Sequence, residues 1–183
     1  DWDFLILRAE ANGMLVIADD GKVIIKRPAI SNSEALQVNY GSSLLEFESE
    51  IDGRTQHKEV KATAWDYSNQ QLFNADSSTS PFTEPGNLSG SDIADAMGPD
   101  AYELHHSGYK TEQELQDWAD GILLRSRLSK VRGRARCTGF AGIKPGDTLK
   151  ISGVGDRFNG KVYVTAVRQE IGQGVWETLI QFG

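Results

Sequence analysis

The C-terminal stretch, residues 132–183, constrains the fold most, because short runs of strand-forming residues alternate there with glycine-rich turns. Four strands are expected at 132–140, 148–152, 161–170 and 176–182. The turns between them contain Pro145-Gly146, a glycine cluster at 153–160, and Gly172-Gln173-Gly174. Short strands at regular spacing with turn residues between them are typical of a small antiparallel barrel or sandwich.

The N-terminal stretch predicts a helix followed by a hairpin. Trp2, Leu5, Ile6 and Ala9 fall at i, i+3, i+4 and i+7, so they form one apolar stripe along a helix at residues 1–12. Asp1 is expected to cap this helix, and Asn12-Gly13 to end it. Two strands at 14–17 and 23–25 then flank the turn residues Asp19-Asp20-Gly21.

A second hairpin is predicted near residue 50. Apolar residues in 45–51 alternate with Glu46, Glu48 and Glu50, which indicates a strand with one buried face and one acidic, solvated face. Asp52-Gly53 favours a tight turn, with a return strand at about 57–65.

The remaining segments are less regular. Residues 28–41 resemble a linker, and the polar residues 69–99 a surface excursion with at most a short helix at 93–97. A capping box at 111–114 begins a helix expected to run to about 130, with Gly121 inside it at some cost. Its apolar stripe consists of Leu115, Trp118, Ala119 and Ile122.

Together these elements predict an α+β chain with mainly antiparallel strands. We expect a helix–hairpin piece of a neighbouring subdomain at 1–30, followed by a small β-barrel-type domain with two helices at 31–183. Within that domain, the polar excursion spans 69–100 and the main helix 111–130. Because the sequence begins directly in a helical pattern, we expect it to be part of a longer protein.

Charge and cysteine content exclude several classes of protein. The net charge of −7 argues against nucleic-acid binding, which needs Lys and Arg to neutralise phosphates. The local basic run at 125–136 is interpreted as a helix end followed by the solvated face of a strand. The one cysteine, Cys137, allows no internal disulfide and fits a reducing compartment. No segment has the length of a membrane-spanning helix.

No motif predicts chemistry. His105 and His106 would point to opposite faces of a strand, and His57 is distant in sequence, so metal binding is disfavoured. The glycine cluster at 153–160 lacks the spacing and the following helix of a dinucleotide-binding loop. Cys137 has no nearby base and is expected to be a small buried side chain. We therefore assign no catalytic, cofactor-binding or metal-binding residues.

Three stretches taken together resemble a known family. They are Asp1–Leu5 with Arg8–Met14; the strand 60–66, which ends in Ala64-Trp65-Asp66; and the segment 143–165, with Pro145-Gly146-Asp147, Gly153-Val154-Gly155, Arg157-Phe158 and Val164-Thr165. In this order they resemble VgrG-type spike proteins and phage tail hub proteins (late control protein D). The chain departs from that family at Arg168-Gln169-Glu170, where a histidine is frequent, and the family's first barrel and its spike segments would lie outside residues 1–183.

The resemblance implies a structural role without enzyme activity. Such hubs form homotrimers in which each protomer supplies two related barrels, and the ring joins the inner tube of a contractile device to its central spike. The implied partners are other copies of the chain, the inner tube protein, further baseplate components, and a spike or effector, with no nucleic acid, cofactor or membrane insertion. Assembly in the cytoplasm and later delivery outside the cell with the tube tip are also implied. From their strand pattern, the edge strands of the barrel, including 162–167, are expected to take part in packing or intersubunit contact.

Two alternatives stay open at this point. A carbohydrate- or peptidoglycan-binding β-barrel of a surface protein would present exposed aromatic residues, for which Trp65, Trp118 and Trp176 are candidates. An enzyme fragment, such as a cell-wall hydrolase domain fused to a tail protein, would need a nucleophile–base pair or a metal cluster.

Overall fold

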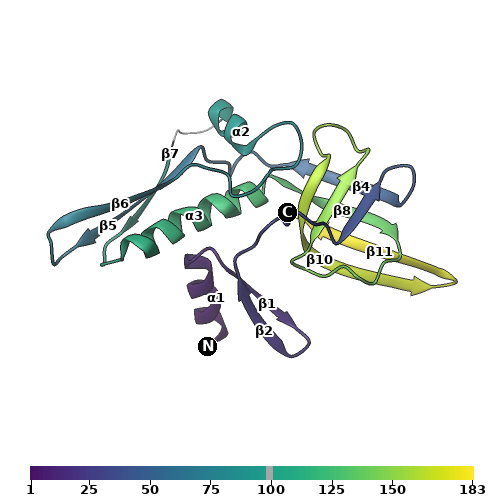
Figure 1. Cartoon of the computed structure of the whole chain (residues 1–183), viewed down its shortest axis with the longest axis horizontal. Coiled ribbons are helices and arrows are strands. Elements are labelled where there is room, and N and C mark those ends of the chain that lie inside the picture. The colour runs from purple at the N-terminus through teal and green to yellow at the C-terminus, as the bar shows by residue number, and fades with distance from the viewer. Residues whose placement is uncertain (98–100) are drawn as a thin grey trace.

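A computed structural model describes residues 1–97 and 101–183 and places them in three parts (Figure 1). A curled six-stranded sheet lies at one end of the long axis, and a three-stranded sheet backed by a helix lies at the other. A helix and a two-stranded hairpin lie beside the junction between them. The predicted class, α+β with mainly antiparallel strands and a barrel-type domain, is confirmed. The division at residue 30 stays a prediction.

The six-stranded sheet contains all four strands predicted for the C-terminal stretch. Its strand order is β3-β9-β10-β11-β8-β4, and the strands are β3 (Leu36–Asn39), β4 (Leu44–Ile51), β8 (Val131–Thr138), β9 (Thr148–Ser152), β10 (Gly160–Gly172) and β11 (Val175–Phe182). Every pairing is antiparallel except that between β3 and β9. The core inside it includes fully buried Val38, Leu149, Val164 and Ile180.

Chain connectivity explains why this sheet curls. The outer strands β3 and β4 are joined only by residues 40–43, yet in a flat six-stranded sheet they would lie about 24 Å apart. The link from Asn39 to Leu44 reaches at most about 18 Å, so the two edges must approach each other. A register shift between Val164 and Ala166 marks a bulge in β10, which bends the strand from β9 toward β11.

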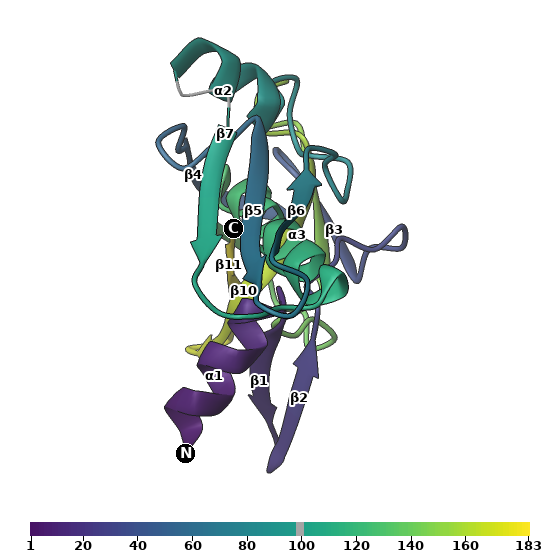
Figure 2. The same cartoon turned by 90° about the vertical axis from the view of Figure 1, so that its left-hand side faces the viewer.

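The three-stranded sheet has the order β6-β5-β7 and packs against one long helix. Its elements are β5 (Glu59–Asp66), β6 (Gln71–Ser77), β7 (Ala101–His106) and α3 (Glu112–Leu128). Figure 2 shows α3 on one side of the sheet and the opposite side uncovered. Val60, Ala62 and Ala64 alternate toward the helix and meet Leu115 and Ala119 of the predicted stripe. The capping box between Thr111 and Glu114 is present as predicted.

The predicted hairpin across Asp52-Gly53 is wrong, because β4 and β5 belong to different sheets. The Asp52 carboxylate accepts bonds from the backbone and side chain of Arg54, which turns the chain away from β4. An alternating pattern identifies a half-buried strand but not its partner. The partner of β4 is β8, whose arginines stand opposite the β4 glutamates.

Two segments interpreted as irregular contain strands. The linker at 28–41 includes β3, which is too short to show a clear period. The excursion at 69–99 includes β6, an edge strand in which Phe73 and Ala75 face the core. Its short helix is α2 (Gly90–Met97), longer than predicted, and residues 98–100 of the excursion lie outside the described residues.

The N-terminal unit consists of α1 (Trp2–Ala11), β1 (Leu15–Asp19) and β2 (Lys22–Lys26), as predicted. Asp1 precedes α1 but its side chain makes no capping bond, so that expectation is wrong. Gly13 ends the helix with a φ of +66°, a conformation that favours glycine. A Cβ on Gly121 would lie 2.6 Å from the Gly13 Cα, so two glycines let α1 approach α3.

Candidate functional site

The three histidines do not meet, as the sequence indicated. His106 packs edge-on against Trp118 on the helix side of the small sheet, while His105 lies on its outer face. His57 stacks on Tyr102 with ring centroids 4.5 Å apart, and burial, with the nearby Arg127, lowers its pKa. Within the described part of the chain, no group of three or more His, Cys, Asp or Glu side chains is placed to hold a metal ion.

One acid–base chain appears that the sequence did not suggest. The Thr63 hydroxyl lies 2.6 Å from His105 Nδ1, and His105 Nε2 lies 3.4 Å from a Glu103 carboxylate oxygen. The three residues share the outer face because they sit in register on β5 and β7. The side chains of His105 and Glu103 are 69% and 65% exposed, so water competes for every contact. Their exposure does not favour a catalytic role, because water weakens the electrostatic interactions that such a chain would use.

The glycine cluster at 153–160 is a wide turn between β9 and β10, in agreement with the sequence interpretation. Asn159 organises it by accepting the Val154 amide on its side chain and the Gly86 amide on its carbonyl. Pro85 lies so close to Gly160 that a Cβ there would meet its Cα at 2.9 Å. The loop therefore contacts residues 85 and 86 of the excursion, and its glycines allow this close contact rather than the binding of a phosphate.

Cys137 is buried in the barrel core, as expected. Its thiol points to the Thr178 carbonyl, and burial raises its pKa. A buried thiol with a raised pKa is a poor nucleophile.

The basic run at 125–136 is largely neutralised within the molecule. Arg134 and Arg136 bond to Glu48 and Glu46 on the neighbouring strand, and Arg136 also bonds to Glu177. Glutamates of β4 and arginines of β8 stand opposite each other and form a ladder of charges on the outer face of the barrel. This pairing explains why acidic residues alternate along β4 and basic residues along β8. These pairs occupy charges that phosphate binding by this run would require.

Two members of the basic run are buried, contrary to the expectation of a solvated surface. The side chains of Arg127 and Lys130 are 1% exposed and lie around Glu84 of the excursion. Lys130 Nζ is 2.8 Å from a Glu84 oxygen and also donates to the carbonyls of Pro85 and Leu88. The same carboxylate accepts the Gly90 amide at the start of α2, so the cluster fixes the excursion to the end of α3.

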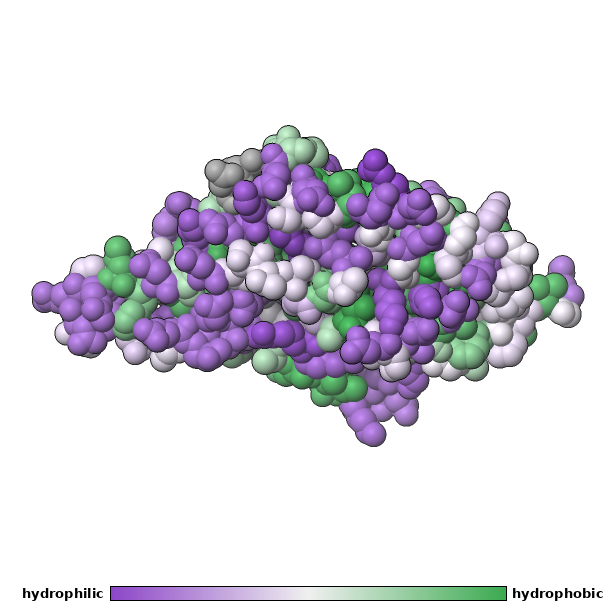
Figure 3. All heavy atoms as spheres, turned by 45° about the horizontal axis from the view of Figure 1, so that its top comes forward, coloured by the Kyte–Doolittle hydropathy of each residue, from purple (hydrophilic) through white to green (hydrophobic). Residues whose placement is uncertain are grey.

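Apolar side chains are exposed at several places, and two of these are the N-terminal unit and the tip of the barrel hairpin. On α1, Trp2, Phe4 and Leu7 are 50–66% exposed, and every residue of β2 is exposed. At the tip of the β10–β11 hairpin, Ile171 is 77% exposed and Val175 54%. The face drawn in Figure 3 is mostly hydrophilic, with hydrophobic residues in small separate clusters. Uncovered apolar groups of this kind mark contact surfaces when they gather.

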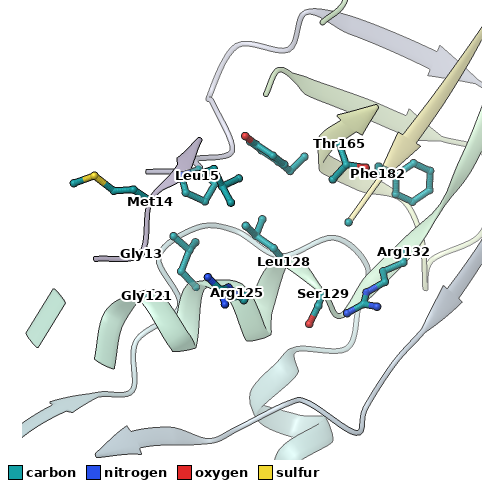
Figure 4. Close-up of a pocket in the computed structure, with 14 residues that line it drawn as sticks. Gly13, Met14, Leu15, Gly121, Arg125, Leu128, Ser129, Arg132, Thr165 and Phe182 are labelled. Carbon is teal, nitrogen blue, oxygen red and sulfur yellow. The ribbon is translucent and has the colours of Figure 1, made fainter. Parts of the chain in front are cut away.

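A pocket of about 390 Å³ lies where the N-terminal unit, α3 and the barrel meet (Figure 4). Leu15, Leu128 and Phe182 contribute apolar surface, and Arg125 and Arg132 flank Leu128 and Ser129. The sequence interpretation missed this pocket, because its walls come from residues 13–28, 121–132 and 163–183, which only the fold brings together.

The predicted strand 162–167 lies in β10, an interior strand rather than an edge. Val162 and Val164 pack in the barrel core, so the packing role is confirmed. No helix in the described ranges, 1–97 and 101–183, is long and apolar enough to span a bilayer.

Several solved structures share this architecture, and some of them are tail proteins. A tail protein from Neisseria meningitidis matches with a TM-score of 0.67 and 13% identity, covering 99% of this chain and 54% of its own. The 43 kDa tail protein of prophage MuSo2 from Shewanella oneidensis matches with a TM-score of 0.67 and 11% identity, covering 99% and 53%. A chain from the virion of a native gene transfer agent particle has a TM-score of 0.57 and 15% identity, covering 96% of this chain and 37% of its own.

These matches define the class of fold: the chain has the fold of phage tail proteins and spans about half the length of the first two. No curated protein sequence matches it. The family model described as the Alg8 N-terminal domain matches residues 1–173, and the chain belongs to that family.

Proposed function

We propose that the chain is a structural component of the hub of a contractile injection device, the ring that joins the inner tube to the central spike. The observation that carries the proposal is the likeness of 99% of the chain to phage tail proteins, together with a chain of an assembled gene transfer agent particle. In this proposal the protein acts as a homotrimer and has no catalytic activity. Its partners are the inner tube protein, other baseplate components, and a spike or effector.

The surface of the chain supports an assembly role. The charges of the β4–β8 ladder cancel on the outer face of the barrel, which leaves the uncovered apolar groups of α1, β2 and the β10–β11 tip for contacts. Obligate contacts between subunits are richer in apolar surface than the rest of a protein surface. Assembly would take place in the cytoplasm, and the assembled particle would carry the protein outside the cell with the tube tip.

The carbohydrate-binding alternative has less support. Trp65 lies on the small sheet, Trp118 on α3 and Trp176 on β11, where its ring covers Gly139. Trp118 packs against the core of the small sheet, and Trp65 and Trp176 lie in different sheets, so these candidates do not share one exposed strand or helix face.

The test is the mass of the complete gene product in solution, measured by sedimentation and followed by electron microscopy. The proposal expects a trimer and a threefold ring with a central channel. A monomer that binds glycan or peptidoglycan fragments would contradict it and favour the alternative.

A further inference from the structure

The pocket between the N-terminal unit, α3 and the barrel has a largely apolar wall. Its volume of about 390 Å³ lies within the range of roughly 300–1,000 Å³ that binding pockets occupy. Leu124 and Phe182 are 4% and 3% exposed, and Leu15 and Leu128 add further apolar surface (Figure 4). A pocket of this kind suits one large apolar side chain, which is how an anchor residue binds in many protein interfaces.

The entrance of this pocket lies on the protein surface. Arg125, Arg132 and Thr165 line the pocket and are exposed. Arg132 and Thr165 also line a neighbouring groove over β4, β8 and β11, so a side chain can enter while the backbone that carries it stays outside. Gly13 and Gly121, whose close approach holds α1 against α3, belong to the same wall. The pocket is therefore formed before a partner arrives, which lowers the cost of binding.

The side chains at this entrance are positively charged, although the chain as a whole carries −7. Arg125 and Arg132 line the pocket, and no Asp or Glu of the described residues does. Within the described ranges the guanidinium of Arg132 has no ion pair or hydrogen bond, not even with Glu50, which stands opposite it on β4, whereas Arg134 is paired. Arg125 has only a loose contact with Glu10 at 3.8 Å. Carboxylates are the groups that such guanidinium groups bind most strongly, together with phosphates.

We propose that this pocket binds an acidic segment of a partner protein through one large apolar side chain. That side chain would lie between Leu15, Leu128 and Phe182. Carboxylates next to it in the partner's sequence would accept hydrogen bonds from Arg125 and Arg132. An apolar interior with charge at its rim has the arrangement of an interface pocket, whereas a neutral apolar ligand would leave both arginines unused. The inference goes beyond the proposed hub function and does not depend on it.

Peptide titration followed by NMR tests the proposal, because the methyl signals of Leu15, Leu124 and Leu128 report entry into the pocket. The probe is an end-blocked peptide with a central phenylalanine and two glutamates on each side. Matched peptides carry alanine at the centre, or glutamine in place of every glutamate. Gly183 also lines the pocket, so an uncharged Gly-Ser tail keeps the terminal carboxylate away from the arginines.

We expect the acidic probe to shift these methyl signals in a saturable, one-to-one manner. The alanine peptide should bind about tenfold more weakly or worse, because the apolar anchor is lost. The glutamine peptide should bind about fivefold more weakly, and only the acidic probe should lose affinity as salt is added.

Substitutions at the two arginines test the charged contacts. Arg132→Gln should weaken binding of the acidic probe by about two- to fivefold and reduce its dependence on salt. The double variant with Arg125→Gln and Arg132→Gln should bind the acidic and the glutamine peptides about equally. Both side chains are exposed, so the methyl signals of the barrel core should stay in place and show that the fold is kept. Arg157→Gln, at an exposed residue outside the pocket, is the matched control and should bind as the unmodified chain does.

Several results would overturn the proposal. They are no saturable shift of the pocket methyl signals with the acidic probe, equal binding of either matched peptide, or an unchanged affinity in the double variant. If the same signals shift with protein concentration in the absence of peptide, a second copy of the chain occupies the pocket and the proposed partner is wrong. A trimeric ring that fails to bind the acidic probe would overturn this inference and leave the hub proposal intact.

Discussion

Replacing Glu84 by glutamine removes the negative charge that lies between two buried cations. Lys130 Nζ lies 2.8 Å from one carboxylate oxygen of Glu84, and Arg127 Nε lies 3.4 Å from the other. Glutamine keeps the size of the side chain and one acceptor, so the change tests charge rather than packing. The substitution leaves both cations buried without a counter-charge.

The expected cost follows from that burial. Removing one partner of a buried ion pair destabilises a protein by about 3–5 kcal/mol. For a chain of this length, each kcal/mol lowers the thermal midpoint by about 2–4 °C, so a fall of about 6–20 °C is expected. Because Glu84 also holds the Gly90 amide, the excursion should become sensitive to protease before the barrel unfolds.

The assay is thermal unfolding followed by circular dichroism, combined with limited proteolysis. Glu48→Gln is the matched control, since it removes a similar charge from an exposed pair with Arg134 and should change stability by less than about 0.5 kcal/mol. If Glu84→Gln lowers the midpoint no more than Glu48→Gln does, the reasoning about the buried cluster is wrong.

Three further changes test other parts of the fold. Gly121→Ala places a methyl group against Gly13 and should destabilise the docking of α1 by about 1–3 kcal/mol, measured by urea unfolding against Glu112→Ala as an exposed control. Cys137 should react with a thiol reagent only after unfolding, and rapid labelling of the folded chain would refute its burial. Burial lowers the pKa of His57, so the unfolded chain takes up a proton first and stability should fall as the pH drops below about 6.5. His57→Phe should lose less stability between pH 8 and pH 5.5 than the unmodified chain, and an equal loss would contradict this assignment.

Local sequence patterns predicted the positions of the helices and strands better than they predicted which strands pair. The glycine turns at 146, 153–155 and 172–174 separate the barrel strands at the expected places, and glycines at 146, 153, 155 and 174 adopt positive φ. The pairing of β4 could not be read from its own sequence, because alternation fits any half-buried neighbour. The signal that could have found it is the match between Glu46, Glu48 and Glu50 and the three arginines of β8.

The candidate sites depend on contacts that sequence spacing does not encode. Glu84 lies in a polar segment with no periodicity, 46 residues before Lys130, yet the two meet in the interior. Arg132 alternates along β8 with the same spacing as Arg134 and Arg136, and nothing in that strand distinguishes a paired arginine from an unpaired one. The resemblance of ordered motifs indicated the kind of fold, which tail protein structures share.

The central claim is that this chain forms part of a hub, and imaging of assembled particles tests it most directly. Particles would be purified from cells that produce the complete gene product with a tag, and examined by electron cryomicroscopy. Our account predicts threefold density at the junction of inner tube and spike into which the two sheets and the N-terminal unit fit. Absence of the tagged product from intact particles, or its presence at a site without threefold symmetry, would contradict the account.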